Sequence, residues 1–277
     1  DMKNPINSEL AIVYREWLEA SKRPNGIFCD KSGVEKYSNP YFFGVPDDWD
    51  TTKDGVRILF VGQEGASGHW NAVDMQSDKY IAFDDVEKLQ EASIATVKKR
   101  VGKENASVEI CGENHPIVGN SSGFWWFFSD IATNGQSEKA CPCAWTNIDL
   151  VCYNEKRSNG KYTLREADRK ALHSTTPPIL KRLIDIAKPT HVVFASWRDV
   201  SVNHELASKP SKIMNDFFVK NDKNSIMLSH VCGIPCLVSY YHPQYLKGRK
   251  ERAQAVRDYI YKNIVDGRVI EAPFDID

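Results

Sequence analysis

The stretch that decides the fold reads Val56-Arg57-Ile58-Leu59-Phe60-Val61-Gly62-Gln63-Glu64. Its apolar residues run from Ile58 to Val61 without alternation, which is typical of a strand buried on both faces of a sheet. The run stops at Gly62, and glycine allows a backbone to turn sharply and to approach a ligand closely. We therefore expect a buried strand over residues 56–61 and a loop of functional interest directly after it.

Further apolar runs predict strands over residues 144–150, 191–196 and 235–240. Helical spacing of apolar residues predicts helices over 8–20, 84–101, 124–131, 177–187 and 250–264, with Ser8 as a cap of the first and Ser121 or Ser122 as a cap of the third. Residues 105–120 look like a loop. Strands that alternate with helices indicate a mostly parallel sheet that is covered on both faces. The expected fold is an α/β protein, a three-layer α/β/α sandwich, in one domain over 1–277 with insertions near 71–120 and 198–230.

Composition and charge narrow the class of protein. Of the 277 residues, 42% are hydrophobic and 26% are charged, and the formal net charge is −1, as in an ordinary globular protein. Any contact with nucleic acid must therefore rest on a local basic patch. No apolar run reaches the roughly 20 residues of a membrane span. Because the first residues also lack the apolar segment of a signal peptide, we expect a cytoplasmic protein with no membrane partner.

The chain has seven cysteines, an odd number, and no Cys-x-x-Cys pair. A disulfide framework is not expected in so large a domain, and the spacing does not fit a zinc or iron–sulfur site. We therefore expect reduced cysteines that pack inside the protein, and neither a metal nor a cofactor.

Two of the expected strand ends carry unusual residues. In open α/β sheets, ligands bind outside the carboxyl ends of the strands. The first strand is followed by a loop that contains Glu64 and three glycines, which read Gly62-Gln63-Glu64-Gly65-Ala66-Ser67-Gly68. The last strand is followed by an imidazole beside a rigid proline, in Tyr241-His242-Pro243-Gln244. Taken singly, a strand-to-helix turn explains the first loop equally well, and a packed histidine is the commoner explanation of the second.

The ordered set of motifs resembles the uracil-DNA glycosylase superfamily. That superfamily has a strand that ends in a Gly-rich loop, best known as Gly-Gln-Asp-Pro-Tyr, and a later strand that ends in His-Pro-Ser. Residues 58–64 and 238–244 resemble these two motifs. Trp145-Thr146-Asn147-Ile148 resembles the strand whose Asn reads the base, and Gly123-Phe124-Trp125 resembles the helix start of the mismatch-type branch. The resemblance spans about residues 57–257 and implies the fold derived above.

The resemblance also implies separate chemical roles for the residues of the two loops. Cleavage of an N-glycosidic bond makes the base an anion and the sugar a cation, after the nucleotide has been flipped out of the helix. Glu64 is then expected to position water or to stabilise the sugar cation. His242 is expected to donate a hydrogen bond to the departing base.

The remaining implied residues hold the base. Gly62 and Gln63 would contact its carbonyls, and the amide of Asn147 would pair with a pyrimidine edge. Phe124 is a candidate for stacking on the base, but core packing is the favoured explanation of this residue, because the helix that it begins is aromatic on every side. His69 or Trp70 would line the pocket in that case.

Basic residues follow the second motif. The segment 247–262 holds six basic residues against two acidic ones, in a chain whose formal net charge is −1. Lys247, Arg249 and Lys250 are the candidates for contacts with the DNA backbone. A solvated helix face is an equally good interpretation of such a charge run.

The expected function is therefore that of a DNA glycosylase that hydrolyses the N-glycosidic bond of uracil or a related damaged base, with uracil-containing or mismatched DNA as partner. Gly65 and Gln244 stand where the family has Pro and Ser, which leaves open a nucleic-acid or nucleobase-binding module with weak or no catalysis. An unrelated α/β hydrolase of a nucleotide-like substrate is a third possibility. It is the least favoured, because the sequence contains neither a His-Glu-x-x-His nor a Walker A motif. The sequence leaves the identity of the base, the strand preference and the oligomeric state open.

Overall fold

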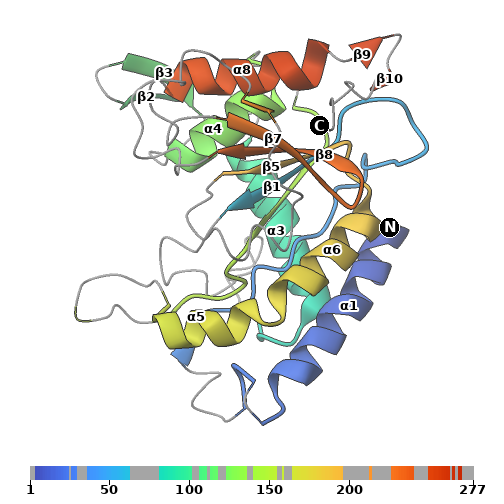
Figure 1. Cartoon of the computed structure of the whole chain (residues 1–277), viewed down its shortest axis with the longest axis vertical. Helices are drawn as coiled ribbons and strands as arrows, with labels where there is room; N and C mark the ends of the chain where they lie inside the picture. Colours follow the sequence, from blue (N-terminus) through green and yellow to red (C-terminus); the bar gives the residue numbers. More distant parts are fainter. Residues whose placement is uncertain are drawn as a thin grey trace.

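The computed structural model describes the chain from residue 4 to residue 269 with gaps (Figure 1). The described ranges are 4–24, 26–29, 36–62, 81–101, 106–110, 113–117, 123–135, 140–154, 158, 164–195, 212–213, 226–239, 249–262, 264–265 and 268–269.

The centre of the fold is a sheet with the strand order β4-β1-β5-β8-β7-β6. Its first four strands are parallel, and they are β4 (Cys143–Asn147), β1 (Ile58–Gly62), β5 (His191–Phe194) and β8 (Ile234–Ser239). The last two strands are antiparallel to their neighbours. Strand β7 (Ile226–Val231) pairs with β8, and β6 (Lys212–Ile213) pairs with β7. Two small antiparallel pairs lie outside this sheet: β2 (Ala106–Ile110) with β3 (Glu113–Ile117), and β9 (Ile264–Val265) with β10 (Arg268–Val269).

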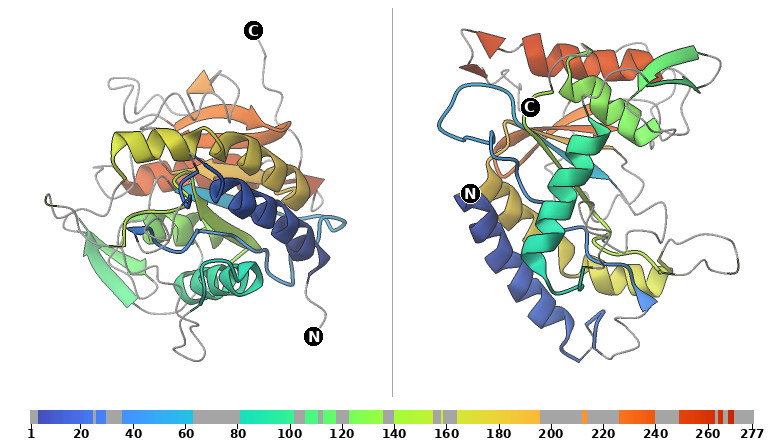
Figure 2. Two further views of the ribbon diagram at one scale, coloured as in Figure 1. Left: turned by 90° about the horizontal axis from the view of Figure 1, so that it is seen from below. Right: turned by 180° about the vertical axis from the view of Figure 1, so that it is seen from behind.

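Helices cover both faces of the sheet, which gives the expected three layers (Figures 1 and 2). One layer holds α1 (Pro5–Ser21), α5 (Glu166–His173) and α6 (Thr176–Ala187), and the other holds α4 (Gly123–Ala132) and α8 (Arg249–Lys262). The remaining helix, α3 (Val86–Arg100), packs against β4 and α1. None of the helices in the described ranges is long and apolar enough to cross a membrane.

Strand β1 shows why its sequence is apolar throughout. Leu59 and Val61 belong to the core that faces α1 and α6, whereas Ile58 and Phe60 belong to the core that faces α4 and α8. On the second side the ring of Phe60 stacks on that of Phe128, with centroids 3.6 Å apart. A strand between two helical layers has no solvent face, so alternation with polar residues disappears.

The predicted helices and parallel strands are present, with boundaries that differ by a few residues. The first helix begins at Pro5 rather than at residue 8, and its cap is Asn4 rather than Ser8. The Oδ1 atom of Asn4 accepts a hydrogen bond from the amide of Ile6 at 3.1 Å. Proline suits the first turn because the amide that it lacks has no partner there.

Other elements were not predicted. Residues 105–120 were expected to be a loop, which is wrong, because they contain β2 and β3. The alternation of Val108 and Ile110 with Ser107 and Glu109 was the signal for the first of these strands. The range 198–230, expected as an insertion, contains β6 and most of β7, which complete the central sheet. Helix α5 has almost no apolar periodicity, since Leu172 is its one buried residue.

Six of the seven cysteines lie in the described ranges, and all six are free thiols. Cys143, Cys152 and Cys236 are buried and Cys141 is half-buried, as expected for packed cysteines, whereas two others are exposed, Cys29 and Cys232. Burial raises the pKa of the Cys141 thiol to about 12, which keeps it protonated at neutral pH.

We predict that His191 makes the protein sensitive to acid. Burial lowers the pKa of its imidazole from the usual 6.5 to about 4. Between these two values the unfolded chain binds a proton that the folded chain does not. Stability is therefore complete above pH 6.5 and falls as the pH drops towards 4, by roughly 3 kcal/mol for this group. Urea unfolding of the wild type and of His191→Phe at pH 7 and pH 4 should show the smaller loss in the variant. Equal losses in both proteins would contradict this role.

We also predict that Lys188→Gly stabilises the fold. Lys188 ends α6 in the left-handed conformation, with φ 46°. Glycine adopts this conformation without the steric cost that a side chain carries, so unfolding should require about 1 kcal/mol more. The control is Lys181→Gly, an exposed position inside the same helix, which should lose about 1 kcal/mol. Thermal unfolding that moves both variants in the same direction would refute the prediction.

Candidate functional site

The candidate site lies at the carboxyl edge of the parallel strands. The chain passes from β1 to β4 on one side and later returns to β5 on the other side of β1. At such a reversal of strand order, open α/β sheets commonly bind ligands outside the carboxyl ends of the strands. Gly62 is the last residue of β1 and therefore stands at this edge of the sheet.

Three of the residues expected to hold a base meet at this point. Gly62 and Asn147 are register partners at the ends of β1 and β4. A Cβ atom at Gly62 would stand 2.2 Å from Oδ1 of Asn147 and 3.5 Å from Cε2 of Phe124. No side chain fits at the first distance, so only glycine lets the amide of Asn147 lie against the end of β1.

The side-chain amide of Asn147 has an unused hydrogen-bond donor among the described residues. Its side chain is 2% exposed, and its Nδ2 atom has no hydrogen-bond partner among the described residues. A buried donor without a partner costs about 1–3 kcal/mol, so an acceptor at this place would be bound favourably. A carbonyl oxygen of a nucleobase is an acceptor of the required kind.

Aromatic rings surround Phe124 at the start of α4. The centroid of its ring lies 5.3 Å from that of the Trp125 ring and 6.4 Å from that of the Trp145 ring, and Phe124 is 7% exposed. Trp125 in turn lies 5.0 Å from Trp145, and Tyr41 lies 5.4 Å from Trp145. The ring of Phe124 therefore belongs both to the core and to the edge of the site beside Gly62.

Several of the expected site residues lie outside the described residues: Gln63, Glu64, Gly65, His69, Trp70, His242, Gln244 and Lys247. The strands that precede the two catalytic candidates are described. Glu64 follows β1 by two residues, and His242 follows β8 by three. Because these strands are parallel members of one sheet, with β5 between them, their carboxyl ends lie about 10 Å apart at the same edge.

The basic residues of α8 divide into two groups. Lys250 is exposed, as a contact with DNA requires, whereas the backbone of Arg249 is described without its side chain. Arg252 is 1% exposed and donates a hydrogen bond to Oγ of Ser239. Arg257 pairs with Asp130 of α4 at 3.1 Å. Two of the six basic residues counted in the sequence therefore face inward.

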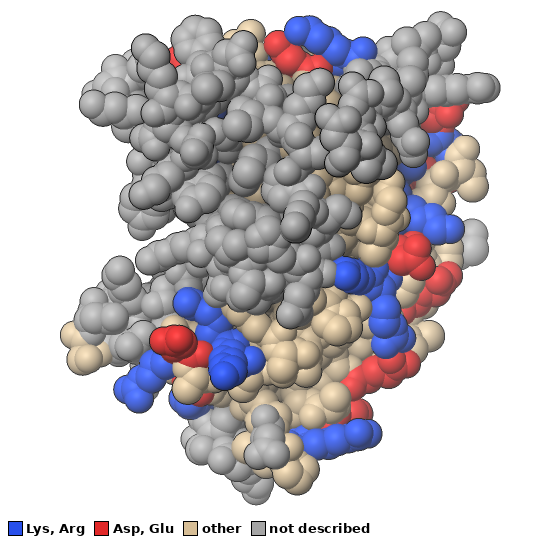
Figure 3. Space-filling view, in the orientation of Figure 1, with Lys and Arg blue, Asp and Glu red and all other residues tan. Residues whose placement is uncertain are grey.

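The face of the molecule drawn in Figure 3 mixes both signs of charge. On the face drawn in Figure 3, Lys and Arg side chains alternate with Asp and Glu side chains along the edge formed by α1. Arg182 pairs with Glu16 at 2.6 Å, and Arg15 pairs with Glu87. A surface of this kind attracts phosphates weakly. The described part of α8 is mixed as well, since exposed Glu251 follows Lys250 and Lys262 pairs with Asp258 at 3.0 Å.

A buried carboxylate next to the site was not predicted. Asp149 follows Asn147 by two residues and is 1% exposed. Its Oδ1 atom lies 2.5 Å from Nε2 of His173, and its Oδ2 atom accepts a hydrogen bond from Nε of Arg169 at 3.2 Å. Both partners belong to α5, so Asp149 fixes this polar helix to the end of β4. Its place directly after a buried strand was a signal that the sequence contained.

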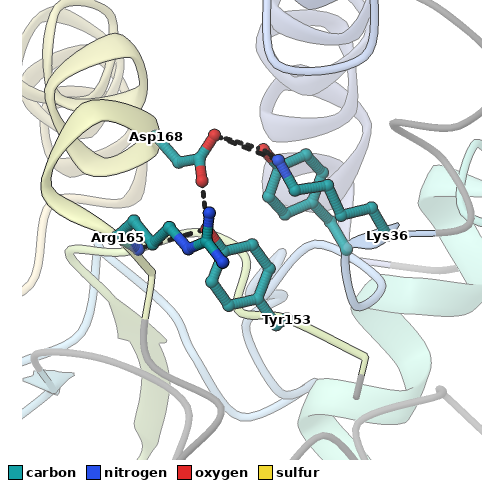
Figure 4. A network of polar contacts seen from close by, with 5 residues as sticks. Lys36, Tyr153, Arg165 and Asp168 are labelled. Atoms are coloured by element: carbon teal, nitrogen blue, oxygen red, sulfur yellow. Dashed lines mark hydrogen bonds and ion pairs between the residues drawn. The ribbon is translucent and has the colours of Figure 1, made fainter. Parts of the chain in front are cut away.

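A second polar network holds the other end of α5 (Figure 4). The hydroxyl groups of Tyr37 and Tyr153 and the ammonium of Lys36 all donate to Asp168, and the two tyrosine rings stack 5.6 Å apart. Partial burial raises the pKa of the Asp168 carboxyl, but the hydrogen bonds from Tyr153, Tyr37 and Lys36 outweigh it and hold this pKa below its usual value. Every member of this network has a partner within it, which indicates a structural tie.

The comparisons with known proteins add no relative. No protein-family model matches the chain, and no curated protein matches it.

Among the described residues, no three His, Cys, Asp or Glu side chains gather where a metal ion could bind.

We predict that Gly62→Ala disturbs Asn147. The new Cβ atom would collide with Oδ1 at 2.2 Å, and such overpacking costs about 1–3 kcal/mol of unfolding free energy. Chemical unfolding measures the loss.

The control is the same change in an Asn147→Ala background, where the colliding atom is missing. There Gly62→Ala should cost much less, so the two substitutions should show a coupling energy of about 1 kcal/mol or more. Additive effects would show that Gly62 and Asn147 do not meet as described.

Proposed function

We propose that this protein is a DNA glycosylase that hydrolyses the N-glycosidic bond of uracil or a related damaged base. The observation that carries the proposal is the meeting of Gly62, Asn147 and Phe124 at the carboxyl edge of the sheet. The resemblance assigned these residues to the base from three separate parts of the chain. Their convergence supports a common role.

The buried amide supports recognition of a base. The Nδ2 atom of Asn147 has no hydrogen-bond partner in the described part of the chain, and the residue is 2% exposed. A hydrogen bond that replaces no water is worth more than an exposed one. A base with a carbonyl at this edge gains the bond, whereas a base with an amino group there leaves two donors facing each other.

The catalytic roles belong to the two loops that follow β1 and β8. Glu64 would position water or stabilise the positive charge that develops on the sugar. His242 would donate a hydrogen bond to the base as it leaves with the negative charge. The two strands that precede these residues end about 10 Å apart at the same edge of the sheet, which supports a shared site.

The residues around the start of α8 would contact the DNA backbone. Lys250 is exposed and follows the second motif by six residues. With Lys247 and Arg249 it would neutralise phosphates beside the flipped nucleotide. Binding should therefore weaken steeply as salt is raised.

The proposal predicts cleavage of uracil-containing DNA. Purified protein is incubated with labelled oligonucleotides that carry uracil in a single strand or opposite G or A, and alkali then breaks the strand at each abasic site. The wild type should produce breaks at uracil. Glu64→Ala and His242→Ala should each lower the rate by about 10²–10³-fold, the usual effect of removing a group that acts in the transition state.

The matched control is Glu16→Ala, an exposed glutamate on α1 that pairs with Arg182. It should cleave as fast as the wild type. Binding without strand breaks would favour a catalytically inactive nucleic-acid-binding module on this fold. If the wild type neither breaks nor binds the DNA, the glycosylase proposal is refuted, and an unrelated hydrolase becomes the better hypothesis.

A further inference from the structure

Helix α8 carries a buried arginine in an apolar setting. Arg252 is 1% exposed, and its neighbours on the inward face of the helix are Ala253, Val256 and Ile260, all fully buried in the core. A guanidinium ion loses its hydration on burial, which costs free energy that methionine or leucine would not lose at the same place. A buried arginine at this position is therefore expected to have a specific role that an apolar side chain could not fill.

The contact made by Arg252 suggests that reason. Its Nη2 atom donates a hydrogen bond to Oγ of Ser239, which is also 1% exposed. Ser239 is the last residue of β8, and it precedes His242 by three residues. The hydrogen bond thus joins the core side of α8 to the point where the second motif leaves the sheet.

The same helix also holds the other side of the site. Arg257 pairs with Asp130, and the hydroxyl of Tyr261 donates to the carbonyls of Ile131 and Ala132 at 3.1 and 3.2 Å. These contacts fix the last turn of α4, whose first turn brings Phe124 against Gly62. Helix α8 is therefore bonded both to the strand that leads into the His242 loop and to the helix that borders the base site.

We propose that Arg252 is a positioning residue, which fixes the carboxyl end of β8, the strand that leads into the second motif with His242. This inference rests on the glycosylase function proposed above. Catalysis depends on such placement, because a shift of about 1 Å in a reacting group can lower a rate about a hundredfold. A purely structural role would instead show itself in stability.

The test separates the two roles with a double variant. Arg252→Met with Ser239→Ala replaces both members of this hydrogen bond by apolar groups, so that neither is left buried opposite the other's missing atom. We expect an unfolding temperature close to that of the wild type, a kcat on uracil-containing DNA at least tenfold lower, and a KM changed by less than about threefold. The single variant Arg252→Met is measured beside it.

The matched control is Arg182→Met, which removes an exposed arginine of α6 that pairs with Glu16, on the opposite layer. It should keep the wild-type kcat and KM. A double variant with wild-type kcat would overturn the positioning role, and so would a loss of kcat that merely follows a loss of folded protein. A wild-type protein without cleavage would refute the proposed function itself, and this role with it.

Discussion

Parallel hydrogen bonding of β1 to β4 on one side and to β5 on the other is the interaction on which the rest of the structure depends. The pairing aligns Gly62 with Asn147, so that two residues 85 positions apart in the chain become neighbours at one edge. It also buries both faces of β1 beneath helical layers, which explains why the strand is apolar from end to end. A change of register by one residue would turn these side chains to the opposite faces and separate the amide from its glycine.

Buried polar groups gather where the parallel strands end. Asn147 closes β4, Asp149 follows it, and Ser239 closes β8, and each is at most 2% exposed. Their partners come from different layers, since Asp149 bonds to α5 and Ser239 bonds to Arg252 of α8. Polar groups are costly inside a protein unless they are bonded. They lie at the same edge as Nδ2 of Asn147, a buried side-chain donor that has no hydrogen-bond partner among the described residues.

Much of the fold could be predicted because each parallel strand is a continuous apolar run and most helices bury one apolar face. The elements that were missed lack these signals. Helix α5 buries Leu172 alone and is held by Asp149 and by the tyrosine network around Asp168, which no periodicity reveals. The position of strand β7 is determined by its hydrogen bonds to β8, and β8 is itself positioned by the other strands of the sheet.

The sequence by itself determined the four parallel strands and the loops at their carboxyl ends, because burial and local backbone preference depend on neighbouring residues. Asn147 and Phe124 became candidates through the resemblance of the motifs that contain them. Only the tertiary structure decided which side chains meet. It set the amide of Asn147 against Gly62, and on one helix it turned Arg252 into the core and Lys250 towards solvent. Strand order, register and helix orientation follow from contacts between distant segments. A pattern of neighbouring residues therefore cannot determine them.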